Sequence, residues 1–436
     1  MIDIRLVREQ LEVVKAAAKN KNADVTAAEI DELAKLDEQR RKLTGAAEDL
    51  RRQRNELAAE TKKGKPSDEQ IDRGRKLRAE LAGSEEELGK VEARYLDILK
   101  RIPNLPAADV PVGASEDDNV VAKTVGEPTK FEFEPKNHWQ LAEAHGWIDK
   151  ERAAKVAGAR FAYLKGGLVR LQFALMQFVI DQLSDEMVIK RIVEGGGEQL
   201  KGVSTRPFVP VLPPYMLRTE IYDAMDRLEP QDERYKIDGE DLWLQGSAEH
   251  VLGSMHAGEI FDEQELPLRY LGFTTAFRRE AGTYGKDMEG ILRMHQFDKL
   301  EMESFTKASA GLAEHFLMVA IQEYLMAQLE IPYQVLLKCT ADIGKPDARG
   351  VDVEAWLPGQ QRYRETHTAD FMSDYQARRL QTRVRSGGDT QLVHTNDATA
   401  MALGRGLLAI LENYQQADGN VRVPVVLQKY YGRDTV

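Results

Sequence analysis

The chain has 436 residues, of which 42% are hydrophobic and 30% are charged, as expected for a globular protein of roughly two or three domains. No apolar run approaches the roughly 20 residues that a membrane-spanning helix needs, and the N-terminal sequence MIDIRLVREQ lacks an apolar signal core. Cys339 is the only cysteine, which excludes an intramolecular disulfide and a cysteine-rich zinc site. We therefore expect a cytoplasmic protein with no membrane contact and no zinc.

The formal net charge is −12, but the charge is unevenly distributed. Residues 51–78 contain ten basic and five acidic side chains, so this stretch carries +5 and the remainder −17. The basic residues are Arg51, Arg52, Arg54, Lys62, Lys63, Lys65, Arg73, Arg75, Lys76 and Arg78. One positive segment on an acidic chain indicates a protein that binds a polyanion at one place.

Residues 30–62 have the repeat of a coiled coil. They contain no proline and one glycine, and apolar positions recur in alternating steps of three and four. The row of leucines in this repeat is Leu36, Leu43, Leu50 and Leu57. After a break at Gly64-Lys65-Pro66, the capping-box spacing of Ser67–Gln70 begins a second helix with a similar stripe. The sequence therefore predicts an antiparallel hairpin over about 30–100, roughly 50 Å long.

Taken alone, such a hairpin is as typical of a dimerisation or spacer element as of an RNA-binding arm, and its basic end favours the second interpretation. A proline-rich linker, IPNLPAADVP, follows the hairpin. We therefore expect an N-terminal domain over residues 1–110 and a second domain over residues 111–436.

The second domain mixes helices and strands. Residues 153–157 and 171–183 have helical patterns, and an amphipathic helix extends from Leu403 to Tyr414. Residues 266–278 and 351–357 have strand patterns. Because helices and strands do not alternate strictly, the predicted fold class is α+β, with an antiparallel sheet flanked by helices. The motifs GxGxxG and GxxxxGK[ST] are absent, so Rossmann and P-loop nucleotide binding lack support.

The stretch Gly272–Glu303 carries the most chemical information. A strand ends in FRRE, a loop with Gly282, Gly285 and Gly290 follows, and a second strand runs from Met294 to Glu301. On this hairpin Arg278 offers bidentate donors to phosphate, and Phe297 offers a flat face to a base. Glu280 is an acceptor for an adenine amino group. Each residue alone has an ordinary alternative, since a strand Arg-Glu pair is usually a surface ion pair and a strand Phe usually belongs to the core.

The order FRxE, glycine-rich loop and HQFxKxE resembles motif 2 of class II aminoacyl-tRNA synthetases, in the form specific to seryl-tRNA synthetases. The resemblance covers nearly the whole chain in order, and its bacterial type is suggested by the arm and by the lack of zinc ligands. Further segments that resemble this family are His138–Gly166, Phe208–Met216 with a motif 1 proline at Pro213 or Pro214, Leu242–His250, Cys339–Glu365, Asp374–Leu380 and, as motif 3, Ala402–Gln415.

The resemblance implies roles for individual residues. Arg278 is expected to hold the α-phosphate of ATP, and Arg405, at the start of the last helix, the γ-phosphate. Glu365 is expected to bind Mg²⁺. Phe297 is expected to stack on adenine while Glu280 and the Met294 backbone fix its edge. Arg279, Thr366, His367 and Thr368 complete the expected ATP-binding set, in which a histidine is unusual for the family.

Serine binding is expected to involve Ser247, Ala248, Glu249, Arg278, Glu301 and Thr399. Hydroxyl and carboxylate groups that pair with the substrate hydroxyl reject alanine, because its absence leaves buried polar groups without partners. The chain departs from the family pattern in Ser247 for threonine, in Thr399 for serine, and in Ala398 and Ala400 for glycines. An alanine in place of glycine narrows the approach of the backbone to a ligand.

As a whole, the resemblance implies a homodimeric serine–tRNA ligase that uses ATP and Mg²⁺ and binds serine tRNA through the basic arm. Two alternatives are an enzyme that activates an amino acid for another carrier and a non-catalytic tRNA-binding relative. The first has no use for the arm, and the second has no reason to keep Arg278, Glu365 and Arg405.

Overall fold

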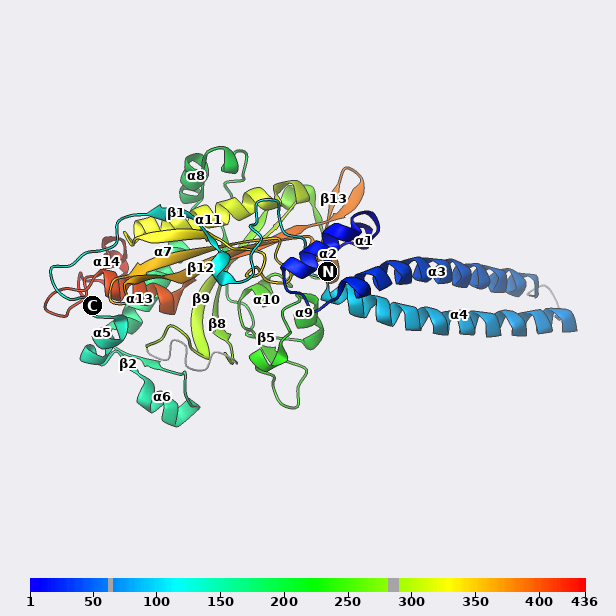
Figure 1. Ribbon diagram of the computed structural model, residues 1–436, viewed down its shortest axis with the longest axis horizontal. Coiled ribbons are helices and arrows are strands. Elements are labelled where there is room, and N and C mark those ends of the chain that lie inside the picture. The colour runs from blue at the N-terminus through cyan, green and yellow to red at the C-terminus, as the bar shows by residue number, and fades with distance from the viewer. Residues whose placement is uncertain (62–65, 281–289) are drawn as a thin grey trace. The chain divides into compact units, whose positions relative to one another are not determined.

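The structure is a computed structural model that describes residues 1–61, 66–280 and 290–436 (Figure 1). The chain forms two compact units, Met1–Leu105 and Pro106–Val436. Among the described helices, none is both long enough and apolar enough to cross a membrane.

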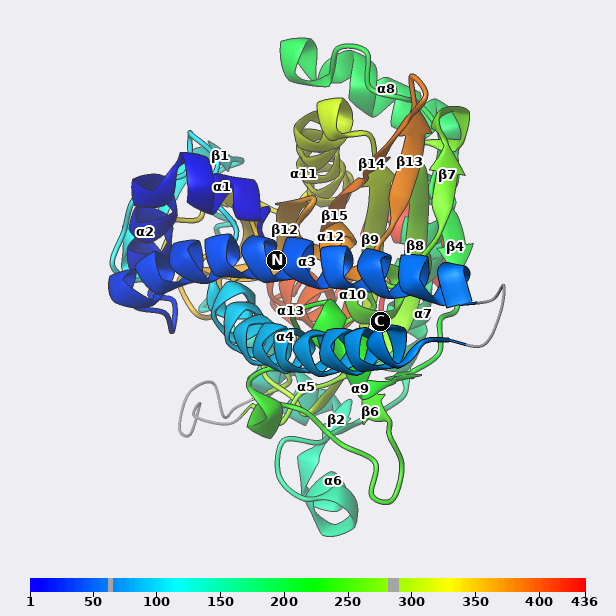
Figure 2. The ribbon, with the colours of Figure 1, turned by 90° about the vertical axis from the view of Figure 1, so that its right-hand side faces the viewer.

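The first unit consists of two short helices and a long helical hairpin. Helices α1 (Ile4–Glu9) and α2 (Leu11–Asn20) precede α3 (Ala27–Thr61) and α4 (Asp68–Arg101), which run side by side (Figure 2). The predicted capping box is confirmed, because Ser67 Oγ accepts from Gln70 N at 3.3 Å and Gln70 Oε1 accepts from Ser67 N at 3.0 Å. The predicted hairpin is therefore present.

Apolar side chains of α3 and α4 meet along a buried seam. Its buried members are Leu33, Ala47 and Leu57 from α3 and Leu77, Leu81, Val91, Tyr95 and Ile98 from α4. Arg40 occupies one of the positions where the sequence repeat lacks an apolar residue. Its guanidinium lies 4.8 Å from the Tyr95 ring centroid and 3.6 Å from the Glu92 carboxylate, so a cation–π contact and an ion pair replace apolar packing there.

The second unit is built on an eight-stranded sheet. In spatial order its strands are β1 (Val120–Val125), β10 (Tyr333–Leu337), β11 (Arg349–Leu357), β12 (Arg362–Ser373), β15 (His394–Ala402), β9 (Gln296–Thr306), β8 (Leu268–Phe277) and β4 (Val209–Val211). Every neighbouring pair is antiparallel except β4 with β8. The predicted α+β class with an antiparallel sheet is confirmed. Strand β9 begins two residues later than predicted and continues to Thr306.

Helices and small sheets surround the large sheet (Figure 1). The helices are α5 (His138–His145), α6 (Lys150–Ala157), α7 (Gly167–Leu183), α8 (Glu186–Gly195), α9 (Thr219–Ala224), α10 (Glu249–Leu252), α11 (Gly311–Gln328), α12 (Tyr375–Leu380), α13 (Leu403–Asn413) and α14 (Val425–Tyr431). The small sheets pair β2 (Ile148–Asp149) with β3 (Tyr163–Leu164), β5 (Met216–Leu217) with β6 (Trp243–Leu244), and β7 (Ile260–Asp262) and β14 (Asp389–Leu392) with β13 (Arg383–Ser386).

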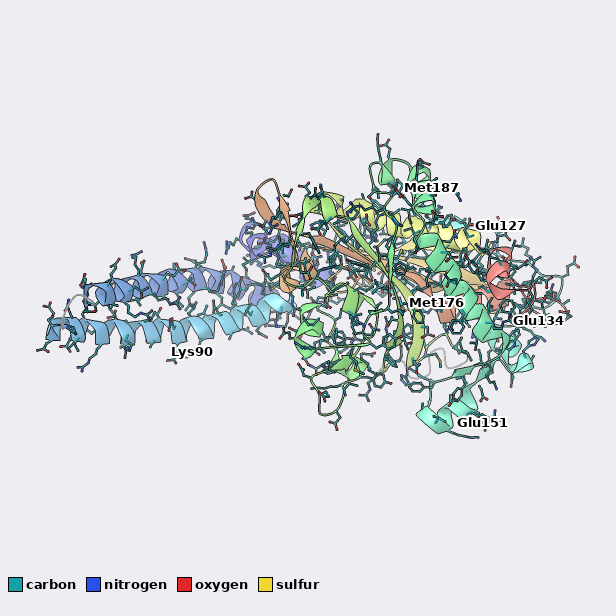
Figure 3. All side chains as sticks on the ribbon, turned by 180° about the vertical axis from the view of Figure 1, so that it is seen from behind. Lys90, Glu127, Glu134, Glu151, Met176 and Met187 are labelled. Carbon is teal, nitrogen blue, oxygen red and sulfur yellow. The ribbon has the colours of Figure 1, made fainter. Side chains whose placement is uncertain are left out.

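The two faces of the large sheet differ in chemistry. Residues such as Met302, Val353 and Ala398 belong to the main apolar core, to which α7, α11 and α13 contribute. Met176 of α7 is a partly buried member of this layer (Figure 3). Because side chains alternate along a strand, the neighbours Glu301, Glu303 and Asp397 point to the other face. That face carries polar side chains and holds the candidate site.

His367 lies on the apolar face. It pairs in register with Val353, and its side chain is 1% exposed, with Nδ1 at 2.8 Å from Thr366 Oγ1. Burial lowers the pKa of His367 from 6.5 to about 4. The unfolded chain therefore binds a proton at this residue between about pH 6.5 and pH 4, where the folded chain does not.

We predict that the free energy of unfolding falls as the pH is lowered from about 6.5 to 4, with roughly 3 kcal/mol contributed by His367. Chemical denaturation of His367→Gln at both ends of this interval measures the contribution. The variant is expected to lose less stability on acidification than the unsubstituted chain. The same substitution at the exposed His145 is the control. Equal losses in the His367 variant and the unsubstituted chain would contradict the prediction.

Candidate active site

Two adjoining cavities open on the polar face of the sheet. Cavity A, of about 180 Å³, is lined by residues that include Arg278, Phe297, Glu365, Thr399 and Arg405. Cavity B, of about 430 Å³, is lined by residues that include Arg227, Ser247, Glu249, Asp370 and Asp397. The residues that line both are Arg278, Glu280, Arg293, Lys299 and Thr368. The two cavities are therefore parts of one site, with Arg278 at their junction.

Arg278 follows the end of β8, where the strand leaves the sheet. Its Nε donates a hydrogen bond to Gly246 O at 2.9 Å, and its guanidinium lies 5.3 Å from the Phe297 ring centroid. Burial lowers the pKa of Arg278, yet a guanidinium stays charged because its ordinary pKa is so high. The remaining N–H groups are donors for an anion at the junction of the two cavities.

Arg405 lies in the first turn of α13 and reaches across to β12. Its Nη1 is 2.7 Å from Glu365 Oε1 and 2.9 Å from Glu365 O. Burial alone would raise the pKa of Glu365, but the positive charges of Arg405, Lys338 and Arg278 hold it below its usual value. Glu365 is therefore a carboxylate at neutral pH. The positive end of α13 adds to the field of Arg405.

An apolar wall closes one side of cavity A. Ile291, Met294, Phe297 and Gly404 line cavity A and also a third, smaller cavity of about 130 Å³. Beside this wall, Glu280 has a left-handed backbone, with a φ of 50°, and its Oε2 accepts from Arg293 Nη1 at 3.0 Å. A flat apolar surface with a polar edge suits a planar heterocycle.

Three of the six residues predicted for serine line cavity B, namely Ser247, Glu249 and Arg278. Ser247 and Glu249 line it, and Ser247 Oγ donates to Glu301 Oε2 at 3.2 Å. Glu301 also forms an ion pair with Lys299, while its buried Oε1 has no hydrogen-bond partner among the described residues. Thr399, in register with Glu301, lines cavity A. These polar groups converge on the junction between the cavities.

Four predicted residues line neither cavity, namely Glu301, described above, and Arg279, Ala248 and His367. Arg279 is exposed, and its guanidinium lies 5.8 Å from the Tyr235 ring centroid. Ala248 is fully buried against β8. A Cβ added at Gly272 of β8 would lie 3.3 Å from the Cβ of Ala248. His367 belongs to the apolar face, whereas Thr366 and Thr368 line cavity A. Alternation along β12 separates His367 from Thr366 and Thr368, whereas Ala248 lies at the start of α10 and Arg279 after the end of β8.

Several residues of cavity B carry no sequence motif that we recognised. Arg227 Nε donates to Glu249 Oε1 at 2.8 Å, and its Nη2 lies 3.0 Å from Asp347 Oδ1. Asp370 and Asp397 line the same cavity. An acidic residue within a strand, as in TADFM and TNDATAM, is a signal that could have drawn attention to these aspartates.

The predicted basic residues of the hairpin fall into three groups. Arg51 and Arg52 lie 2.8 Å and 2.9 Å from the carboxylates of Glu85 and Asp49, and Arg75 lies 3.7 Å from that of Asp72. Lys62, Lys63 and Lys65 lie outside the described residues. The exposed cations that form no ion pair within the described ranges are Arg54, Arg73, Lys76 and Arg78. The hairpin therefore presents cationic side chains to solvent on both helices.

Known proteins resemble the chain over its whole length. Residues 1–106 match the family model "Seryl-tRNA synthetase N-terminal domain", and residues 233–414 match "tRNA synthetase class II core domain (G, H, P, S and T)". The serine–tRNA ligase of Methanocella arvoryzae is 39% identical over 438 residues, which cover 99% of this chain and 98% of that protein.

Solved structures agree with the sequence relatives. The seryl-tRNA synthetase of Pyrococcus horikoshii, complexed with ATP, has a TM-score of 0.88 at 37% identity and covers 100% of this chain and 99% of its own. The cytoplasmic serine–tRNA ligase of Naegleria fowleri, in complex with AMP, has a TM-score of 0.84 at 28% identity, with 100% and 98% covered. The chain belongs to the seryl-tRNA synthetase family of class II aminoacyl-tRNA synthetases.

Proposed function

We propose that the protein is a cytoplasmic serine–tRNA ligase that activates L-serine with ATP to seryl-adenylate and pyrophosphate and then transfers serine to the terminal adenosine of serine tRNA. One observation carries the proposal: Arg278 and Arg405, which are far apart in the sequence, line one cavity together with Phe297 and Glu365. This arrangement suits a bent nucleoside triphosphate whose base stacks on the Phe297 ring.

Each residue of cavity A has a physical task in the first step. Arg278, at the junction of the cavities, holds the α-phosphate while the serine carboxylate attacks it from cavity B. Arg405 holds the γ-phosphate at the far end of the triphosphate. Little covalent help is needed, because positioning in line and stabilisation of the charge on the phosphoryl oxygens lower the barrier. Phe297 supports the adenine ring, and Glu280 and the Met294 backbone define its edge.

Glu365 fits a magnesium ion that enters with ATP. Its side chain is ionised and 45% exposed, and Mg²⁺ typically takes one or two protein carboxylates together with substrate phosphates. When bound beside Glu365, such an ion would supply positive charge to stabilise the pyrophosphate leaving group. Within the described ranges, no group of three or more His, Cys, Asp or Glu side chains could hold a metal ion by itself.

Serine is selected in cavity B. The ammonium group lies near Glu249, which Arg227 and Gln376 orient with hydrogen bonds of 2.8 Å and 2.9 Å to Oε1. Glu301, with one oxygen without a partner, accepts from the substrate hydroxyl. Alanine would leave that buried oxygen without its donor, which costs binding energy.

The second step needs the terminal adenosine of tRNA at the junction of the cavities. We assign tRNA binding to the N-terminal domain, residues 1–110, and catalysis to residues 111–436. The exposed Arg54, Arg73, Lys76 and Arg78 are donors for phosphate groups. A relative that activates an amino acid for another carrier would have no use for these cations, and a non-catalytic relative would not need both arginines of cavity A.

We also propose a homodimer through the edge of the sheet at β4. This edge strand and the segment after it expose Val209, Leu212, Tyr215 and Met216, whose exposed fractions range from 41% to 79%. Pro213 is buried and Pro214 is exposed, so Pro214 is the motif 1 proline available to a partner. Exposed apolar side chains beside an unpaired strand edge favour contact with a second copy.

We predict that Arg278→Ala lowers serine-dependent ATP–pyrophosphate exchange by at least about a hundredfold, because a lost charged donor to a developing phosphoryl charge costs that much. Arg279→Ala is the matched comparison, since its guanidinium lies over Tyr235. It should lose far less activity. Near-normal exchange in the Arg278 variant, with the fold checked by circular dichroism, would contradict the assignment.

The arm has its own test. A variant with Arg73, Arg75, Lys76 and Arg78 changed to glutamine should keep serine-dependent exchange and lose most tRNA charging, with a KM for tRNA raised at least tenfold. The salt dependence of tRNA binding should also become less steep. Replacement of Lys42 and Lys90, which lie nearer the base of the arm, is the control. Equal losses of exchange and charging would remove the proposed role.

The proposed dimer predicts that Leu212→Asp shifts the protein toward monomers, because Leu212 is 79% exposed and a charge in an apolar interface is costly. Sedimentation velocity at several concentrations measures the shift. Val425→Asp is the control, because Val425 of α14 is 71% exposed and lies away from this edge in the sequence. An unchanged oligomeric state in the Leu212 variant would exclude this edge as the interface.

A further inference from the structure

A row of three carboxyl groups crosses the sheet below cavity B. Asp370 of β12 pairs in register with Asp397 of β15, and Asp397 pairs in register with Glu303 of β9. The three side chains are 8%, 4% and 1% exposed. Paired residues on adjacent strands point to the same face, and like charges placed directly opposite destabilise a sheet. The row is therefore unfavourable unless something compensates for it.

The described protein does not supply that compensation. One oxygen of Asp370, one of Asp397 and both of Glu303 are buried without a hydrogen-bond partner among the described residues. No described cation forms an ion pair with any of the three. Burial raises the pKa of all three groups well above the usual range. Burial thus favours the protonated forms of the row, and a cation placed beside it would favour the ionised forms.

Three of the cations that line cavity B, Arg227, Lys299 and Arg293, are paired with other carboxylates. The other two, Arg234 and Arg278, donate to the backbone carbonyls of Arg227 and Gly246. Arg227 binds Glu249 and Asp347 at 2.8 Å and 3.0 Å. Lys299 forms an ion pair with Glu301. In the function proposed above, the α-ammonium group of the amino acid lies near Glu249. Asp370 and Asp397 line the cavity and have no described ion-pair partner, so they can bind a second cation.

We propose that cavity B also accepts, and prefers to serine, a short diamino acid such as 2,3-diaminopropionate, in which an ammonium group replaces the serine hydroxyl. This proposal rests on the function proposed above. The side-chain ammonium lies between Asp370 and Asp397 and donates to their free oxygens, while a hydroxyl of serine cannot balance their charge. The cavity of about 430 Å³ has room for a longer side chain as well.

The chemistry of activation is unchanged for such a substrate. The carboxylate oxygen forms a bond to the α-phosphorus, and the bond between that phosphorus and pyrophosphate breaks. The second ammonium takes no part in bond making, so it contributes to binding alone. The preference should therefore appear in KM rather than in kcat.

The test is ATP–pyrophosphate exchange by the full chain with serine, alanine, 2,3-diaminopropionate and 2,4-diaminobutyrate. We expect a KM for 2,3-diaminopropionate at least tenfold below that for serine. In Asp370→Asn and Asp397→Asn the ratio of the two KM values should shift at least tenfold toward serine, because each variant removes a charge and retains the shape. Glu354→Gln is the matched control, since this carboxylate lies on β11 and accepts from Gln334 at 2.6 Å outside the cavity.

Exchange with serine but with neither diamino acid would overturn the inference and leave the proposed function intact. An unchanged KM ratio in both asparagine variants would also overturn it. Thermal stabilisation by Mg²⁺ or Mn²⁺ without nucleotide, lost in Asp397→Asn, would assign the row to a metal instead. If the variants do not fold, the substrate panel with the unsubstituted chain still decides. Loss of exchange with every amino acid would count against the proposed function itself.

Discussion

The site depends on two charged and partly buried guanidinium groups, those of Arg278 and Arg405, fixed on one face of an antiparallel sheet. Arg278 is retained by the Gly246 carbonyl and the Phe297 ring, and Arg405 by the carboxylate and carbonyl of Glu365. Fixed acceptors keep both groups in place before any ligand arrives, which lowers the cost of reorganisation when charge develops. The positions of β8, β12 and α13 follow from this requirement, because each supplies one part of the same cavity.

Two irregularities in the sheet bring these parts together. The register of β12 with β11 shifts next to Thr366, and that of β15 with β9 shifts between Thr399 and Met401. A bulge re-aims the side chains that flank it, and bulges are common beside active sites. In a regular strand, Glu365 and His367 would share a face. Here Glu365 lines cavity A, whereas His367 is buried with the apolar core.

The sequence predicted the elements better than it predicted the exact faces of their residues. The hairpin helices follow from an unbroken leucine row and a capping box, both of which are local patterns. The cluster of Arg278, Phe297, Glu365 and Arg405 was accessible through motifs. Arg279, Ala248 and His367 were assigned as neighbours of site residues. The bulge in β12 separates His367 from the cavities, whereas Ala248 lies at the start of α10 and Arg279 lies after the end of β8. The sequence marked Asp370 and Asp397 only as acidic residues within strands, and cross-strand register brings them together at cavity B. Arg227 lies outside the strands, and no local pattern indicated that it lines the same cavity.

The distribution of acidic groups connects stability with specificity. Burial shifts the pKa of Glu303, Asp370 and Asp397 upward, which favours their neutral forms and reduces the repulsion along the row. A ligand cation favours the ionised forms, so its binding places charge where a partner of opposite sign matches it. Such a row destabilises the free protein relative to an apolar one. The cost in stability is expected where the face of the sheet binds a ligand. The exposed cations of the hairpin are comparable, because they too lack partners within the described protein and are available to a ligand.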